Sequence, residues 1–361
     1  MKRTLALLLT AALSLSLSLL GGCGRKAPPA ASSGPDPAVS SSGSSQPDGP
    51  DSSSPPEADA PVIRFMALSG PTGMGASWLM NYYSPENAPA DAPFLLDGTI
   101  VTDNQEVTNA LINGDADIAA VATNVAANLY AKSDGAIQVL AVNTLGVLYI
   151  LEKGNTVHSI SDLKGQVVYA PSNTKGANPE HILNHLLKGN GVDPSQVKIE
   201  WLTPQEITVK MTSSDAGICM LPVPAATALL VQDSGVREAV SLSEAWMDLE
   251  ESELPMGCLA ARTELIERSD PALIETFLDL YGDSISFVED NPSDAAALAV
   301  ELGILPSEKV AERAIPQCAL TLTTGQEMKT MLESYYSILF RTAPESIGGG
   351  LPYDSFYYGV G

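Results

Sequence analysis

The stretch VIRFMALSGPTGMGASW, residues 62–78, decides the fold of this chain. Its first seven residues are an apolar run typical of a buried strand, and a glycine-rich turn follows them. From Met74 onward, Trp78 and Tyr82 recur at four-residue spacing, which predicts a helix whose stripe packs in a core. The glycines are spaced G-x-x-G-x-G and lack the lysine of a phosphate loop, so nucleotide binding is disfavoured. The stretch predicts a strand, a tight turn that contacts a solute, and a helix; a turn without ligand is the alternative.

Apolar runs alternate with helical patterns along the following 190 or so residues, which is typical of an α/β protein with mostly parallel sheets. Further strands are predicted at 118–122, 137–142, 147–151, 166–170, 197–202, 217–221 and 257–261. Capping boxes that begin at Asp103 and Thr203, and an Asn178 cap before Pro179, mark helix starts between them. The end of the chain is almost entirely helical, with helices predicted at 271–289, 294–302, 308–314 and 325–340.

The segment AVNTLGVLYILE, residues 141–152, predicts a crossing between two lobes. One strand ends at Asn143, Gly146 supplies a bend, and another strand begins at Val147. The return is expected near residues 254–258. We therefore expect lobe 1 to comprise residues 62–143 and 256–361, and lobe 2 to comprise residues 144–255. One continuous doubly wound sheet is the alternative.

The amino terminus predicts export. Lys2 and Arg3 precede an apolar run from Leu5 to Leu20, which indicates a secretory signal peptide over residues 1–22. The following LGGC, residues 20–23, resembles the lipobox of bacterial lipoproteins, which implies cleavage before Cys23 and lipidation of that residue; an uncleaved anchor is the alternative. Residues 23–60 are rich in Ser, Pro, Gly, Asp and Ala and predict a disordered tether.

The charge of the chain argues against two classes of partner, and its cysteine content raises the question of a disulfide. The formal net charge is −24, which argues against nucleic acid and against docking on anionic lipid through a basic face. An exported chain can oxidise its thiols, and besides Cys23 there are three cysteines, at 219, 258 and 318. We expect a disulfide between Cys258 and Cys318, with buried free thiols as the alternative.

Several segments resemble the nitrate/taurine (NitT/TauT-like) group of ABC-transporter solute-binding lipoproteins, which have the periplasmic binding protein type II fold. These segments are GPTGMG (70–75), NGDADIAAVATNVAANLY (113–130), NTLGVLYI (143–150), SISDLKGQVVYAPS (159–172), PMGCLAAR (255–262) and ESIGGGLPYDSFYY (345–358). The resemblance implies two lobes, each a mostly parallel sheet flanked by helices, with the helical C-terminal segment on the first lobe. It also implies that the lobes close on a small solute and deliver it to an ABC permease with its ATPase.

Ligands of open α/β sheets bind beyond the carboxyl ends of the strands, so the residues that follow those ends are the site candidates. The predicted ligand-binding residues are Ser69, Thr72, Gly73, Met74, Thr123, Asn124, Asn143, Thr144, Ser172, Asn173 and Lys175. Helix caps, hinge hydrogen bonds and, for Lys175, a solvated side chain are the structural alternatives. His181 and His185 share a helix face as zinc ligands can, but a chain with three histidines disfavours a metal site.

These observations predict an exported, lipid-anchored, monomeric solute-binding protein of an ABC importer at the outer face of the cell membrane. No catalytic constellation is recognisable, so we expect neither enzyme activity nor a cofactor. The candidate loops hold a single basic residue, which favours a neutral or weakly anionic organic solute. An exported enzyme and a sensory lipoprotein on the same fold are the alternatives.

Overall fold

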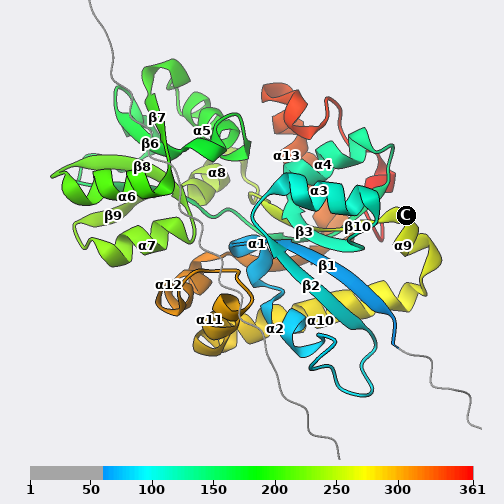
Figure 1. The fold of residues 1–361 in the computed structure, drawn as a ribbon. Coiled ribbons are helices and arrows are strands. Elements are labelled where there is room, and N and C mark those ends of the chain that lie inside the picture. Colours follow the sequence, from blue (N-terminus) through cyan, green and yellow to red (C-terminus); the bar gives the residue numbers. More distant parts are fainter. Residues whose placement is uncertain (1–59, 361) are drawn as a thin grey trace, which may run out of the picture. The chain divides into compact units, whose positions relative to one another are not determined.

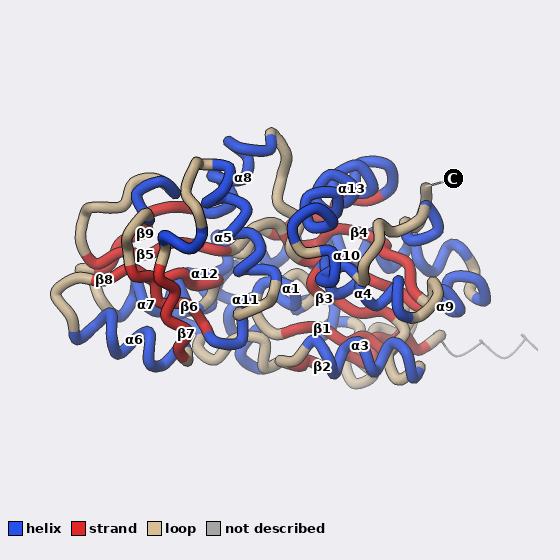
Figure 2. The backbone as a smooth tube through the Cα atoms, turned by 90° about the horizontal axis from the view of Figure 1, so that it is seen from above, coloured by secondary structure: helices blue, strands red, loops and turns tan. Residues whose placement is uncertain are grey.

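Two β-sheets flanked by helices make up residues 60–360, which are the residues that this computed structural model describes (Figure 1). The predicted signal peptide, the lipidation site at Cys23 and the tether up to residue 59 lie outside the described residues. Figure 2 shows the strands of the two sheets as two separate groups. Within residues 60–360, none of the helices has the length and apolar character required to cross a membrane. The predicted α/β class is confirmed.

The first sheet has six strands in the order β11-β4-β10-β3-β1-β2. Their bounds are β1 Val62–Leu68, β2 Leu95–Val101, β3 Ile118–Ala122, β4 Ile137–Thr144, β10 Gly257–Arg262 and β11 Leu320–Thr324. β1 pairs in parallel with β2 and β3, whereas β10 is antiparallel to both β3 and β4, and β11 is antiparallel to β4. The strand that returns late in the chain therefore enters the centre of the sheet between two earlier strands.

The second sheet has five strands in the order β7-β6-β8-β5-β9. Their bounds are β5 Leu148–Lys153, β6 Val167–Pro171, β7 Lys198–Leu202, β8 Gly217–Pro222 and β9 Val236–Ser241. β6 is parallel to β7 and β8, and β5 is antiparallel to β8 and β9. Both sheets are therefore mixed, and the prediction of mostly parallel sheets is wrong. An apolar run marks a buried strand without encoding its direction, which is why the sequence pattern missed this.

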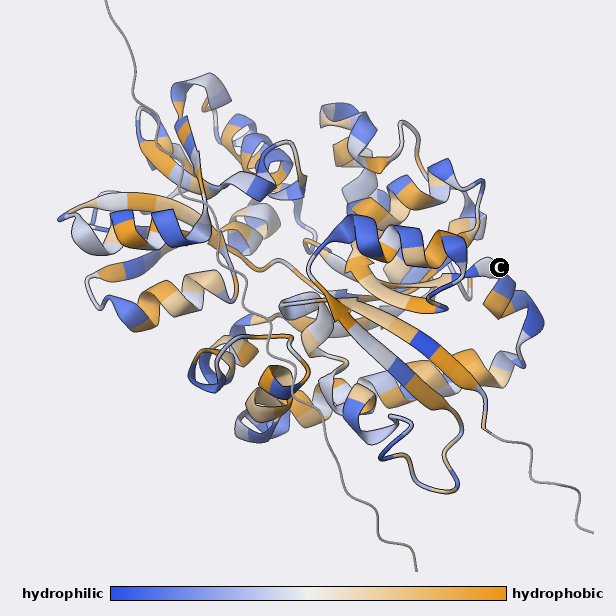
Figure 3. Cartoon of the chain, in the orientation of Figure 1, coloured by the Kyte–Doolittle hydropathy of each residue, from blue (hydrophilic) through white to orange (hydrophobic). Residues whose placement is uncertain are grey.

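Thirteen α-helices connect and cover these strands in the described residues. They are α1 Pro71–Met74, α2 Ser77–Tyr82, α3 Asn104–Asn113, α4 Thr123–Lys132, α5 Asn178–Gly189, α6 Pro204–Ser213, α7 Ala225–Gln232, α8 Leu242–Glu250, α9 Thr263–Arg268, α10 Pro271–Asp290, α11 Pro292–Glu301, α12 Glu308–Ala314 and α13 Gly325–Thr342. Figure 3 shows apolar residues concentrated in the strands and hydrophilic residues on the helices. α10 and α13 pack on strands of the first sheet, as expected, whereas α12 also contacts α7 of the second sheet.

Two chain segments connect the sheets. Residues 145–147 lead from β4 to β5, and residues 251–256 return from α8 to β10. The Met256 backbone N–H donates to the Thr144 carbonyl oxygen over 2.9 Å, so the two segments lie side by side. Gly146 is required here for space: a Cβ on it would lie 2.0 Å from Ser243 Oγ and 3.1 Å from Leu254 Cδ2. The predicted lobe boundary between residues 255 and 256 falls within the returning segment, whereas the one between 143 and 144 falls inside β4, one residue before its end. The lobe boundaries remain a prediction.

The cysteines that the structure describes are all free and buried, so the predicted bridge between Cys258 and Cys318 is not formed. The reason is their position: Cys258 packs in one hydrophobic cluster with Tyr336, and Cys318 packs in another with Val288. Burial raises the pKa of the Cys219 and Cys318 thiols to about 12. Burial therefore keeps these thiols protonated at physiological pH.

Glu152 on β5 is a buried carboxylate held by several donors. Its oxygens accept hydrogen bonds from the backbone N–H groups of Thr156 (2.7 Å) and Val157 (3.2 Å), and the Arg237 guanidinium pairs with it. Burial alone raises the pKa of Glu152, but these hydrogen bonds and the arginine outweigh that effect and lower it. The charged carboxylate is therefore part of the folded second sheet.

Candidate functional site

A cavity of about 250 Å³ lies between the two sheets, beyond the carboxyl ends of β1, β3, β4 and β6. Amide and hydroxyl side chains from both sheets line it: Thr72, Asn104, Asn124 and Thr144 from the first, and Asn173, Thr174 and Asn178 from the second. Val125, Val147, Pro179 and Met256 supply apolar surface. Among the described residues, no charged side chain lines this cavity. The arrangement suits a small molecule with polar groups and an apolar part.

Four of the eleven predicted site residues meet at this cavity. Thr72 follows β1, Asn124 lies in the first turn of α4, Thr144 ends β4, and Asn173 follows β6. These positions come from four separate stretches of chain, and the carboxyl ends of the strands bring them together as the sheet topology predicts. Whether they contact a solute remains a prediction.

The other residues of the glycine turn have structural roles in the described fold. A Cβ at Gly73 would lie 2.4 Å from the Leu68 carbonyl oxygen, so only glycine allows this close approach of backbone to backbone. Met74 is fully buried in a cluster with Val147 and Val223. The Ser69 N–H donates to the Val101 carbonyl oxygen over 2.8 Å. Of this turn, only Thr72 faces the cavity.

Thr123 and Asn143 support the cavity from behind. The fully buried Thr123 hydroxyl donates to the Pro255 carbonyl oxygen over 2.9 Å and so joins the start of α4 to the returning segment. Asn143 Nδ2 donates to the carbonyl oxygen of Thr72 (2.9 Å) and to the hydroxyl oxygen of Tyr281 (2.8 Å). Both side chains therefore fix residues of the wall without lining it.

Ser172 and Lys175 lie on the surface. Both side chains are exposed, and neither lines the cavity although Asn173 and Thr174 between them do. The short 3₁₀ turn Ser172–Thr174 brings Asn173 and Thr174 to the cavity and leaves Ser172 in solvent, which a sequence pattern does not reveal. For Lys175, the solvated alternative is the one that the structure favours.

Two amide groups at the cavity carry polar atoms without partners. Asn124 Oδ1 and Asn178 Nδ2 are buried and make no hydrogen bond with any residue in 60–360. Asn178 is only 6% exposed. A buried donor or acceptor left unpaired costs about 1–3 kcal/mol, so such atoms mark a place where a partner is expected. One atom is an acceptor on the first-sheet side, and the other is a donor on the second-sheet side.

The amino termini of two helices also lie at the cavity. α4 and α5 begin at its walls, and within the described chain neither helix has a side-chain cap on its first N–H groups. Uncapped N–H groups and the positive end of the helix dipole favour an acceptor oxygen or an anion. The Thr123 N–H at the start of α4 already donates to the Met256 carbonyl oxygen, and Pro179 in α5 has no N–H. The remaining backbone N–H groups add to the donors of the lining side chains.

Asn178 is the most informative residue that the sequence assigned differently. It was predicted as the cap of α5, but Ala177 holds that position and Asn178 is the first helical residue. Its amide is thereby free to reach the hydroxyl of Tyr335, which donates to Asn178 Oδ1. Asn104 and Met256 line the cavity without having been predicted as site residues, because tertiary contacts bring them there.

A second cavity of about 350 Å³ adjoins the first. The two share Asn104, Asn124, Val125 and Ala177, and the second extends along α3 and α4 to Ile112 and Lys132. The site thus continues from an uncharged inner cavity toward one that has a lysine in its lining. A solute larger than the inner cavity has room in this direction.

The sequence was compared with protein-family models and with curated proteins. A family model described as NMT1/THI5 like matches residues 100–295, more than half of the chain. A search of curated proteins found no significant match.

Solved structures share the fold. An ABC transporter structure from Parabacteroides distasonis is 21% identical, with a TM-score of 0.68 over 82% of this chain and 98% of that chain. The periplasmic aliphatic sulphonate binding protein SsuA from Escherichia coli is 16% identical, with a TM-score of 0.64 over 80% and 90%. The alkanesulfonate-binding protein SsuA from Xanthomonas axonopodis pv. citri, bound to MOPS, is 12% identical, with a TM-score of 0.57 over 79% and 94%. The predicted resemblance is confirmed at the level of family and fold. The chain belongs to the NMT1/THI5-like family and has the fold of these periplasmic binding proteins.

Proposed function

We propose that this chain is the extracytoplasmic solute-binding protein of an ABC importer and that it binds a small organic solute in the cavity between the two sheets. The unpaired Asn124 Oδ1 and Asn178 Nδ2 carry this proposal. They lie on opposite walls, are buried, and have opposite hydrogen-bonding character, so a solute with one donor and one acceptor satisfies both. The lining side chains are amides, hydroxyls and apolar groups, which favour binding over acid–base catalysis.

The cavity indicates the chemical class of the solute. Its polar side chains are uncharged, which favours a neutral or weakly anionic molecule whose oxygen is received by the N–H groups of α4 and α5. Val147, Pro179 and Met256 favour an apolar part in the same molecule. A volume of about 250 Å³ corresponds to a small metabolite. The sulphonates named for the two SsuA proteins are acceptor-rich organic solutes of comparable size, and they are among the compounds to be tested.

Binding between the sheets implies closure as the mechanism. A solute that contacts both walls makes its full set of contacts only when the walls are together, so it shifts the population toward the closed arrangement. The segments 145–147 and 251–256 are the connections about which such a motion would occur. The closed form is then the one presented to the permease and its ATPase.

The cellular setting follows from the sequence alone. We place the protein outside the cell membrane, lipid-anchored at Cys23 and carried as a monomer on a tether over residues 23–60. Replacing Cys23 with Ala is expected to release the protein from the membrane fraction. Mass spectrometry of the wild-type amino terminus is expected to show a diacylglyceryl cysteine, and an unmodified Cys23 would contradict the anchor.

A thermal-shift screen of small metabolites, including sulphonates and neutral carboxamides, tests the binding role. A compound at 100 times its Kd stabilises the fold by about 2.7 kcal/mol, which corresponds to a rise of about 5–10 °C in Tm. We expect the Asn124→Ala variant to lose most of this shift for the same compound. Ser172→Ala, an exposed position next to the cavity lining, is the matched control and is expected to keep it. An undiminished shift in Asn124→Ala would contradict the proposed site.

A further inference from the structure

Neighbouring tyrosines on α13 reach opposite walls of the cavity. The Tyr336 hydroxyl donates to the Thr123 carbonyl oxygen over 2.8 Å, at the start of α4. The Tyr335 hydroxyl donates to Asn178 Oδ1, at the start of α5. Both tyrosines are fully buried. Because α4 follows a strand of the first sheet and α5 follows a strand of the second, this tyrosine pair of one helix contacts both halves of the site.

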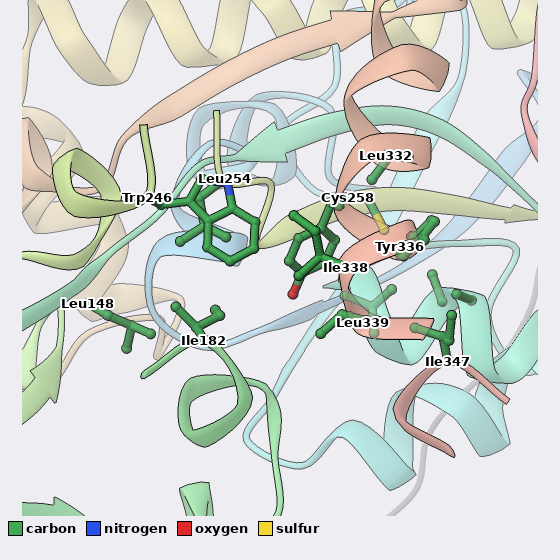
Figure 4. Packing of buried hydrophobic residues seen from close by; sticks show 14 of the residues in the cluster. Leu148, Ile182, Trp246, Leu254, Cys258, Leu332, Tyr336, Ile338, Leu339 and Ile347 are labelled. Carbon is green, nitrogen blue, oxygen red and sulfur yellow. The ribbon is translucent and has the colours of Figure 1, made fainter. Parts of the chain in front are cut away.

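The Tyr335 ring packs against the second-sheet half as well. Its centroid lies 5.8 Å from that of Trp246 on α8, and the Trp246 ring lies 5.2 Å from His185 on α5. Figure 4 shows Trp246, Leu148 and Ile182 in one continuous hydrophobic cluster with Leu332 and Tyr336 of α13. The cluster is apolar, and the hydrogen bond to Asn178 is the polar contact that Tyr335 makes within it.

This hydrogen bond engages one end of the Asn178 amide. With Oδ1 engaged by the tyrosine hydroxyl, Nδ2 is the atom left without a partner. A tyrosine hydroxyl can both donate and accept, so the opposite amide orientation would bond it through Nδ2 and leave Oδ1, an acceptor, at this wall. In the observed arrangement this wall of the cavity therefore offers an N–H donor.

We propose that Tyr335 is a positioning residue that couples closure to recognition. It holds α5 against α13 when the two halves are together, and the same bond presents Asn178 Nδ2 to an acceptor of the solute. The coupling to a solute rests on the proposed function. The closure contact itself is a property of the protein without ligand, and it is tested in that state.

The test measures distances between the halves in the ligand-free protein by double electron–electron resonance. Spin labels are placed through Asn109→Cys on α3 and Lys188→Cys on α5, two exposed positions, with Cys23→Ser in the background. The buried thiols at 219, 258 and 318 are expected to stay unlabelled. The Tyr335→Phe variant keeps the ring and loses the hydroxyl.

We expect Tyr335→Phe to lower the ratio of closed to open molecules about two- to tenfold, the range for one hydrogen bond. Asn178→Leu removes the other partner and is expected to give the same change, and the double variant is expected to add nothing further. Tyr130→Phe is the matched control, since its hydroxyl bonds Ser355 Oγ (2.7 Å) within the first-sheet half. A distance distribution unchanged by Tyr335→Phe and Asn178→Leu, or equally changed by Tyr130→Phe, would overturn the proposal. Neither result would bear on the thermal-shift screen, so the two proposals fail separately.

Discussion

Replacing Asn124 with Leu is expected to stabilise the ligand-free protein while it removes solute binding. Asn124 Oδ1 is buried at the cavity without a hydrogen-bond partner in the described chain. An unpaired buried acceptor costs about 1–3 kcal/mol, and leucine has the same branched arrangement of side-chain heavy atoms, so the substitution leaves no large void. Because the rest of the side chain is half-buried, we expect the lower end of that range, about 1 kcal/mol. The Tm of the ligand-free protein is then expected to rise by about 2–4 °C.

The same substitution removes the acceptor that the proposed solute needs, so the affinity is expected to fall about tenfold or more. Differential scanning calorimetry of the ligand-free protein gives the stability, and isothermal titration with the best compound of the screen gives the affinity. Ser133→Ala is the matched control, because Ser133 Oγ at the far end of α4 is also buried and unpaired. That variant is expected to gain stability without losing affinity. A less stable Asn124→Leu protein with unchanged affinity would refute the reasoning.

Three further predictions concern the fold that supports the site. Gly146→Ala is expected to lower the free energy of unfolding by about 1–3 kcal/mol, because the new Cβ meets Ser243 Oγ, and Ser243→Ala is expected to restore part of it; a double-mutant cycle in urea unfolding without coupling would contradict this. The pKa of Glu152 is lower in the folded state than its ordinary 4.5. The carboxylate therefore adds to the free energy of unfolding above about pH 4.5, and this stabilisation is lost as pH falls through the folded pKa. Glu152→Gln is therefore expected to be less stable than wild type at pH 7 and to flatten the pH dependence of urea unfolding below pH 5; parallel profiles would argue against this role. The thiols of Cys219 and Cys318 are expected to react with Ellman's reagent at pH 8 only after denaturation, and rapid reaction of the native protein would contradict their burial.

Most of the strands that were predicted from the sequence have continuous apolar runs; the edge strand β7, KIEWL, was predicted as well. β1, β3 and β10 sit inside the first sheet, and their buried positions make the pattern unambiguous. The missed strands β2, β9 and β11 all lie at sheet edges, where part of the strand is exposed and its sequence becomes polar. Strand direction was also missed, because it depends on pairing partners that are distant in the sequence.

The cavity-lining residues that could be predicted from the sequence are those at or directly after the end of a strand. Thr72, Asn124 and Thr144 follow from the rule that ligands bind beyond the carboxyl ends of strands. Asn178 and Met256 reach the cavity through tertiary contacts, with Tyr335 and with Thr144 at the end of β4. Such contacts join residues more than a hundred positions apart, so a local sequence pattern does not predict them.

The most direct test of the account is a crystal structure of the protein with the compound that gives the largest thermal shift. We expect density for that compound in the cavity between the sheets, with an acceptor bonded to Asn178 Nδ2 and a donor bonded to Asn124 Oδ1. Density for the compound at another place, with both amide atoms still unpaired or bonded only to water, would contradict it.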